Sequence, residues 1–210
     1  MRIEGLRSNK NVIIQLLFFR LLAFAVVVAS FSWIACNNNQ PANDNRQTDN
    51  EKTNSGAQHA TATLNGTKPD TTVIGTVRFY ETGGGKVGMQ LQITVPKKAN
   101  QSVAVHIHEH GDCGNMGKHA GGHWNPTRQN HGKWGSGSFH SGDIGNIPLD
   151  ANGRGLLQLE TGLWSIGGDA QSNILNKTII VHSGVDDYTS QPSGNSGERI
   201  GCGVIRNTNQ

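Results

Sequence analysis

The stretch VHIHEHGDC, residues 105–113, alternates apolar side chains with histidines over its first four positions. This alternation predicts a β-strand that buries Val105 and Ile107 on one face and projects His106 and His108 from the other. Side chains two residues apart on a strand stand about 6 to 7 Å apart, which allows two imidazoles to reach one ion. We therefore interpret this strand as one wall of a metal site.

Further ligand-type residues follow this strand in the sequence. His182 ends the run IIVH at 179–182, which predicts a second strand that holds a third copper-type ligand on a rigid element. The donors between the two strands are His123, His131, His140 and Asp143. Such a set of nitrogen and oxygen donors completes a tetrahedral zinc site, and its carboxylate favours zinc. Copper would then keep only three ligands of its own, so we expect His123 to bridge both ions.

Two other interpretations of the histidines are weaker. The first is a polar surface cluster in a glycine-rich loop, and it does apply to His59, His110 and His119, which fall outside the pattern. The second is an unrelated zinc hydrolase. Such an enzyme needs a general base beside an open zinc position, whereas the predicted zinc set is closed.

Short alternating segments separated by turn residues recur along the chain. They cover residues 60–64, 73–80, 87–95, 102–109, 155–160, 178–182 and 203–206. This pattern predicts an all-β fold, an antiparallel barrel or sandwich, with a hairpin loop at Gly83-Gly84-Gly85. Residues 111–142 carry almost no strand pattern, and we expect metal ligation to order them.

The N-terminus has the architecture of an export signal. In residues 1–35, basic residues precede the apolar run 21–35, and Cys36 follows at once. Cys36 resembles a bacterial lipoprotein site, which predicts lipidation there and an exported protein anchored to a membrane of the cell envelope, periplasmic or outer-membrane associated. An uncleaved anchor, or a cysteine that merely ends the signal, is the alternative. The polar composition of residues 36–60 predicts a disordered tether, so the folded domain should span residues 61–210.

The net charge excludes one class of partner. The whole chain carries a formal charge of +3 at pH 7, but residues 1–35 hold four basic residues and one acid. The remaining chain is therefore about neutral, which gives no support for nucleic-acid binding.

The metal pattern resembles the copper/zinc superoxide dismutase family, in its bacterial secreted branch, over residues 61–205. The resemblance rests on the steps of 15, 8, 9 and 3 residues from His108 through the ligands to Asp143. It also rests on the GDIGN turn at 142–146, the IIVH strand, and GERIGCGVI at 197–205. It implies a Greek-key antiparallel β-barrel with long metal-binding and channel-lining loops.

The resemblance also implies a role for each site residue. The implied copper ligands are His106, His108, His123 and His182. The implied zinc ligands are His123, His131, His140 and Asp143. Asp186 matches the carboxylate that hydrogen-bonds one copper histidine and one zinc histidine, here His106 and His131.

Three more residues acquire roles from the resemblance. Arg199 matches the arginine that attracts and positions a small anion beside the copper channel. Cys113 and Cys202 match the family's intrachain disulfide.

The implied activity is dismutation of superoxide to O₂ and H₂O₂ by alternate reduction and oxidation of copper. Arg199 and His123 are the implied catalytic residues, since the bridging histidine leaves reduced copper, takes up a proton and delivers it to the peroxide. A metal-buffering protein of the same fold would lack a copper ligand or the arginine, and a copper-only enzyme would lack zinc ligands. The sequence leaves both a monomer and a homodimer open.

Glu198 raises a question about anion attraction. It directly precedes Arg199, and a carboxylate turned into the channel would weaken the local positive potential. The segment 189–197 matches the family's channel-lining loop but carries no charge. We therefore expect attraction of superoxide to depend mainly on Arg199 and the metals.

Overall fold

The computed structural model describes residues 59–208 of the chain. Within that range it contains β-strands and two short 3-10 helices, η1 (Pro96–Lys98) and η2 (Lys118–Ala120). No helix among these residues is long and apolar enough to cross a membrane. The predicted export signal, lipidation at Cys36 and tether up to residue 58 lie outside the described residues. The first strand begins at His59, slightly before the predicted domain boundary.

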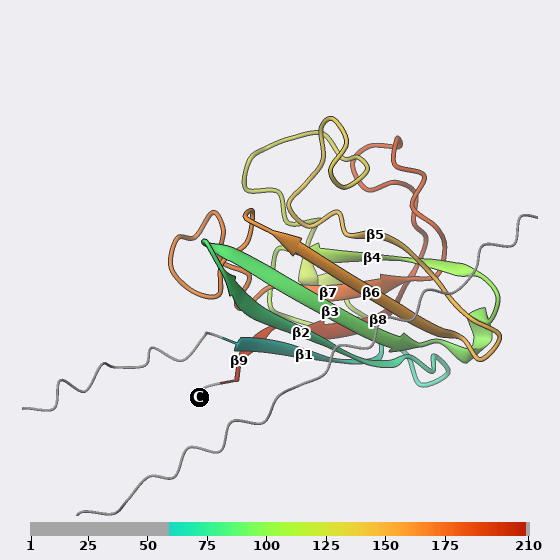
Figure 1. Cartoon of the computed structure of the whole chain (residues 1–210). Helices are drawn as coiled ribbons and strands as arrows, with labels where there is room; N and C mark the ends of the chain where they lie inside the picture. Colours follow the sequence, from blue (N-terminus) through green and yellow to red (C-terminus); the bar gives the residue numbers. More distant parts are fainter. Residues whose placement is uncertain (1–58, 209–210) are drawn as a thin grey trace, which may run out of the picture. The chain divides into compact units, whose positions relative to one another are not determined.

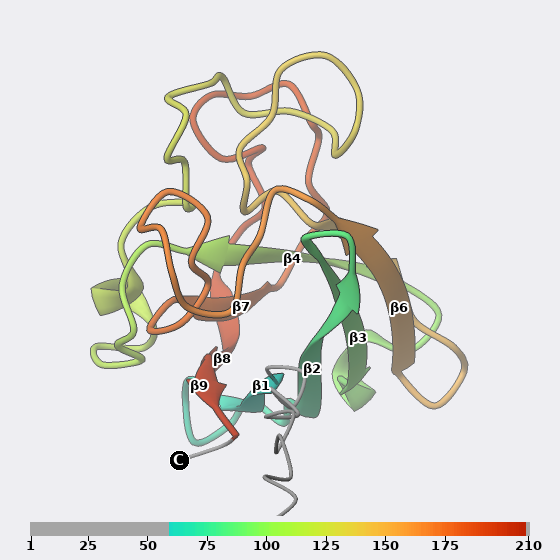
Figure 2. The ribbon, with the colours of Figure 1, turned by 60° about the vertical axis from the view of Figure 1, so that its left-hand side comes forward.

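The strands form one antiparallel sheet that curls into a nearly closed barrel (Figures 1 and 2). They are β1 (His59–Gly66), β2 (Ile74–Gly83), β3 (Lys86–Thr94), β4 (Ser102–His108), β5 (Gly145–Pro148), β6 (Arg154–Thr161), β7 (Thr178–His182), β8 (Arg199–Val204) and β9 (Arg206–Asn207). The order is β5-β4-β7-β8-β1-β2-β3-β6, with β9 beside β1. The connections from β3 to β4 and from β6 to β7 join strands that are not neighbours, as a Greek key requires.

Two strand predictions differ from the structure. β5 was not expected, because Gly145-Asn-Ile-Pro148 is short and lacks an alternating apolar pattern; Pro148 is tolerated because β5 is an edge strand. β8 begins at Arg199 and not at 203. Its glycines give little β-propensity, but its backbone pairs with β7 and β1.

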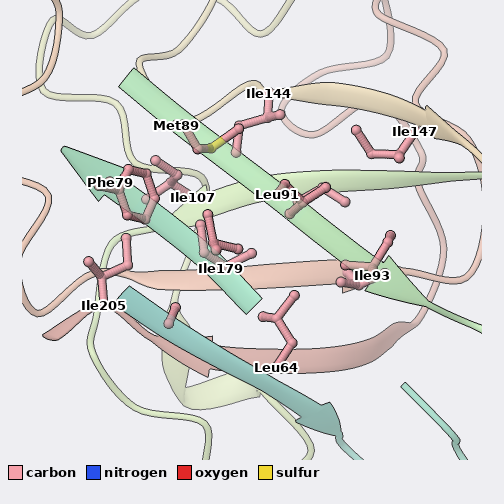
Figure 3. Packing of buried hydrophobic residues seen from close by; sticks show 14 of the residues in the cluster. Leu64, Phe79, Met89, Leu91, Ile93, Ile107, Ile144, Ile147, Ile179 and Ile205 are labelled. Atoms are coloured by element: carbon pink, nitrogen blue, oxygen red, sulfur yellow. The ribbon is translucent and has the colours of Figure 1, made fainter. Parts of the chain in front are cut away.

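The core fills the barrel with the apolar faces of the strands. Figure 3 shows Phe79, Leu91, Ile107 and Ile179 among the side chains gathered there, and none of these four exceeds 1% exposure. Burying one such side chain stabilises the fold by about 1.5 to 3 kcal/mol. The inward positions of β4 include Val105 and Ile107, so the histidines of this strand face away from the core. This confirms the orientation predicted from VHIHEHGDC.

Two long connections lie at one side of the barrel. Residues 109–144 join β4 to β5, and residues 183–198 join β7 to β8. Figures 1 and 2 both show the yellow part of the first and the orange-red second lying side by side above the strands. Except for η2, residues 109–144 contain no regular helix or strand, as the sequence indicated. The candidate site lies where these connections meet β4 and β7.

Candidate metal centre

Two backbone hydrogen bonds fasten the first connection to β4, and a third joins the two attached parts of the connection to each other. The Trp124 N–H donates to Ile107 O (2.8 Å), the Ile107 N–H donates to Gly142 O (2.9 Å), and the Gly142 N–H donates to Trp124 O (3.0 Å). A Cβ at position 142 would stand 2.2 Å from Ile107 O, so only glycine permits this approach. These bonds bring His123 and Asp143, the neighbours of the bonded residues, against the strand that carries His106 and His108.

The structure brings the predicted ligands together in two groups. The first group is His106, His108, His123 and His182. The second group is His123, His131, His140 and Asp143. In each group, one ligand atom from every residue lies within 4.8 Å of the others, and all these residues are buried. His123 is the member that the groups share.

A single carboxylate orients one imidazole of each group. His106 Nε2 donates to Asp186 Oδ2 (2.8 Å), and His131 Nε2 donates to Asp186 Oδ1 (2.9 Å). Asp186 is itself held by Asn146, which accepts from its N–H (2.7 Å) and donates to its carbonyl (2.9 Å). Because the carboxylate only accepts, the Nε2 atoms carry the protons and the Nδ1 atoms are free to bind cations. The Asp186 carboxylate thus contacts one histidine of each group.

Backbone carbonyls orient three further rings. His108 Nδ1 donates to Gly121 O (3.0 Å), His182 Nδ1 to Gly197 O (3.3 Å), and His140 Nε2 to Gln129 O (3.1 Å). A carbonyl only accepts, so each inner nitrogen is unprotonated and available as a ligand. These acceptors could not be predicted from the sequence, because every residue has a backbone carbonyl.

His123 differs from the other five site histidines. Its Nδ1 lies 2.8 Å from Asp143 Oδ1, within the second group, and its Nε2 is buried without a hydrogen-bond partner. No described acceptor outside the two groups takes a proton from its ring. Both nitrogens of His123 are thus directed at ligand positions, one in each group.

Unpartnered buried nitrogens show that the groups fit metal ions. His106 Nδ1, His131 Nδ1 and His140 Nδ1 are buried without a hydrogen bond. His131 Nδ1 lies 2.9 Å from Asp143 Oδ2, but without the geometry of a hydrogen bond. Buried polar atoms of this kind are costly unless something satisfies them. Four imidazoles suit copper, and three imidazoles with a carboxylate suit zinc.

Burial keeps three of the site histidines neutral. Desolvation lowers the pKa of His123 to about 4 and that of His182 to about 3, and it lowers the pKa of His108 well below its usual value. Burial by itself raises the pKa of Asp143, but the adjacent rings of His123 and His140 and hydrogen bonds from the backbone N–H groups of His140 and Gly132 outweigh it and hold that pKa far below the usual range. At neutral pH His108, His123 and His182 are therefore neutral imidazoles and Asp143 is a carboxylate, the forms that bind metals.

A cleft of about 700 Å³ opens onto the first group. Its walls include His108, His123, His182 and Arg199, together with Gln191 and its neighbours in the second connection. The guanidinium of Arg199 donates to Gly117 O (2.5 Å) and Gly121 O (2.6 Å). Arg199 therefore presents a fixed positive charge beside the copper-type ligands.

The disulfide Cys113–Cys202 supports this arrangement. It joins residues 89 apart, with Cα atoms separated by 5.8 Å, and ties the start of the first connection to β8. Arg199 lies on the same strand, and its carbonyl partners Gly117 and Gly121 lie in the segment that the disulfide anchors.

Glu198 does not face the cleft. Its carboxylate lies 2.9 Å from Lys68 Nζ and is absent from the cleft-lining residues. The concern that Glu198 offsets the charge of Arg199 within the cleft is therefore not supported by the structure. The remaining histidines, His59, His110 and His119, are exposed and outside both groups, as expected.

Comparisons with known proteins agree with this geometry. A family model described as copper/zinc superoxide dismutase (SODC) matches residues 73–205. The extracellular superoxide dismutase (Cu-Zn) of Caenorhabditis elegans is 35% identical over 66% of this chain, and the match spans only 63% of that protein. Superoxide dismutase (Cu-Zn) 2 of Aquifex aeolicus is 36% identical over 64% of this chain and 80% of its own length.

Two further comparisons cover more of the chain. The superoxide dismutase (Cu-Zn) of Yarrowia lipolytica is 35% identical over 70% of this chain and 96% of its own length. Among solved structures, the crystal structure of the clock protein EA4 is similar, with a TM-score of 0.63 and 30% identity over 71% of this chain and 94% of that chain.

Proposed function

The chain belongs to the copper/zinc superoxide dismutase family, and from this membership we propose that it is an exported, membrane-anchored superoxide dismutase. The enzyme converts two superoxide anions and two protons into O₂ and H₂O₂. Its cofactors are copper, held by His106, His108, His123 and His182, and zinc, held by His123, His131, His140 and Asp143.

The observation that carries this proposal is the environment of His123. The other five site histidines each donate their outer ring nitrogen to an acceptor, whereas both nitrogens of His123 face the ligand groups. A ring placed in this way serves as a ligand to two ions only after losing both protons. This supports the two-metal enzyme over a protein with separate metal sites.

Bound copper supplies one-electron reduction and oxidation, and bound zinc supplies a fixed charge without redox chemistry. Arg199 attracts the anion, and its guanidinium, fixed by two carbonyls, orients it in the cleft. His123 lines the cleft, and its Nε2, when it is not bound to a metal ion, can hold a proton and donate it to the peroxide product. Asp186 keeps the rings of His106 and His131 from turning while the proton moves.

Export and anchoring form the second part of the proposal. The disulfide is typical of oxidising compartments, and one relative is named extracellular. The apolar run 21–35 before Cys36 supports a lipoprotein signal of the bacterial type. Lipidation at Cys36 anchors the mature protein to the cell envelope, and the part of the proposed tether 36–60 that precedes β1 links the two. Light scattering of the purified protein distinguishes a monomer from a homodimer.

The activity is tested on the full chain purified with copper and zinc. Wild type should bind one of each ion and dismutate superoxide much faster than the same concentration of free copper. His123→Ala should lower activity and the occupancy of both sites, while His119→Ala should change neither. The proposal fails if His123→Ala retains metals and activity. For anchoring, Cys36→Ser should move the protein from the membrane fraction to the soluble fraction.

A further inference from the structure

We propose that Gln191 is a positioning residue for the zinc ligand His131, an inference that rests on the zinc site proposed above. The His131 N–H donates to Gln191 Oε1 (2.9 Å), and Gln191 Nε2 donates to His131 O (2.9 Å). One side-chain amide thus pairs with both polar groups of one residue's backbone, which lies 60 positions earlier in the chain. Two simultaneous bonds fix both the position and the direction of that peptide.

His131 depends on this contact because its own segment is irregular. Residues 125–139 contain no helix or strand. Among the described hydrogen bonds, the N–H and C=O of His131 have no partner other than Gln191. His131 is only 3% exposed, so water is a poor substitute for a lost partner. Without the amide of Gln191, the backbone that carries this ligand is free to shift.

The segment that carries Gln191 also contacts the ring of His131. Asp186 accepts from His131 Nε2. Gly194, with a φ of +66°, packs so closely that a Cβ would stand 1.9 Å from Asp186 Oδ1 and 2.5 Å from His131 Nε2. The segment folds on itself, since the Gly194 N–H donates to Ser190 O (2.7 Å) and the Asp187 N–H to Gly194 O (2.9 Å). Residues 186–194 therefore hold this ligand by its ring and by its peptide.

Gln191 also forms part of the cleft wall, on the same cleft as Arg199. The paired amide and peptide consequently link the wall of the substrate cleft to a ligand of the second metal group. The amide oxygen and nitrogen of Gln191 both bond the backbone of His131, so we do not assign Gln191 as a ligand. Its effect on zinc is exerted through the position of His131.

The test compares variants of Gln191 in the full chain loaded with copper and zinc. Gln191→Met keeps the length of the side chain and loses both hydrogen bonds to His131, together with a longer one from Nε2 to Thr189 O (3.4 Å). Gln191→Asn keeps the amide but is one methylene too short, and Gln191→Glu keeps only the acceptor. Gln158→Ala, at an exposed position on β6, is the control. The readouts are the rate of zinc release to a chelator and the visible spectrum of Co²⁺ placed in the zinc site.

We expect Gln191→Met and Gln191→Asn to release zinc at least tenfold faster and to alter the cobalt spectrum. Gln191→Glu should fall between them and wild type, and Gln158→Ala should match wild type. If zinc release and the cobalt spectrum are unchanged in Gln191→Met, the inference is overturned. The side chain would then contribute only its volume to the zinc site, and its hydrogen bonds would have no role.

A measurement on wild type keeps the inference testable if the variants fail to fold. The backbone amide of His131 should exchange with solvent deuterium slowly, as a bonded N–H does; rapid exchange in the zinc-loaded protein contradicts the pairing. A wild-type protein that binds no zinc refutes the proposed function itself. Zinc binding that is insensitive to Gln191 refutes only the positioning role.

Discussion

His106 Nε2 and Asp186 Oδ2 lie 2.8 Å apart, and neither side chain is exposed to solvent. The other oxygen of Asp186 accepts a hydrogen bond from His131, so one buried carboxylate sets the tautomer of a ligand in each metal group. The orientation of both groups therefore depends on a residue that belongs to neither of them.

Replacing Asp186 by Asn should weaken metal binding without removing a ligand. The amide cannot accept from two imidazole N–H groups, so the ring of His106 or His131 loses its fixed tautomer. Loss of an outer partner of this kind typically costs about 10- to 100-fold in metal affinity. Competition with a chelator, followed by metal analysis, measures the change. Asp187→Asn, one residue away on an exposed side chain, is the control; equal affinity in the two variants would contradict the role of Asp186.

The pairing of Lys68 with Glu198 should influence the rate of anion capture. Lys68→Ala leaves the carboxylate of Glu198 unpaired beside Arg199, so kcat/KM should fall about two- to threefold at low ionic strength. Glu198→Gln should raise kcat/KM, and the double variant should lie close to wild type, because it removes one charge of each sign. These differences should disappear in high salt, because exposed charges are screened.

Lys86→Ala is the matched control for this prediction, since Lys86 forms an exposed pair of the same length with Glu160, remote from the cleft in sequence and sheet position. A salt-independent loss of kcat/KM in Lys68→Ala would indicate a change of structure and not of electrostatic attraction.

The metal-free domain should lose stability as the pH falls from about 6.5. The pKa of His123 is lowered to about 4 and that of His182 to about 3 in the folded state, from a usual value of 6.5. Between these values the unfolded chain binds protons that the folded chain does not, so each group removes up to about 1.4 kcal/mol per pH unit. Once the pH is below the folded pKa, that group contributes no further loss.

Urea unfolding of metal-free protein at pH 7, 6 and 5 measures this effect. Asp143 and Asp186 also have lowered pKa values, but their contribution begins only below 3.8, outside this window. His182→Asn should show a shallower dependence on pH. A free energy of unfolding that is constant from pH 7 to pH 5 would contradict the burial of neutral histidines.

Removing the disulfide should destabilise the domain and lower activity. The bond closes a loop of 89 residues, and the loop-entropy relation gives a contribution of about 4 to 5 kcal/mol. In Cys113→Ser with Cys202→Ser, the segment that holds Arg199 through Gly117 and Gly121 also loses its covalent link to β8. Urea unfolding should show the loss of stability. At a temperature where the variant is folded, kcat/KM should still be reduced; an unchanged value would show that Arg199 is held without the disulfide.

Much of the fold could be predicted because alternation is a local property. On a strand, His106 and His108 must face away from the side that carries Val105 and Ile107, and in the structure they do. β5 was not predicted, and β8 begins earlier than predicted. Both strands contain glycine or proline at positions where apolar and polar residues would otherwise alternate. Their pairing partners lie far away in sequence, so only the assembled sheet identifies them.

The sequence by itself determined which side chains can bind metal, because imidazole and carboxylate chemistry belongs to the residue, and the order of these residues along the chain predicted two ligand sets. The tertiary structure decided what surrounds those atoms. The carbonyls of Gly121, Gly197 and Gln129, the turn of Glu198 toward Lys68, and the contact of Gln191 with His131 join groups that are distant along the chain. Every residue has a backbone carbonyl, so the sequence does not show which carbonyl will accept a hydrogen bond. The direction of an exposed side chain depends on its neighbours in space. Both are therefore known only once the chain has folded.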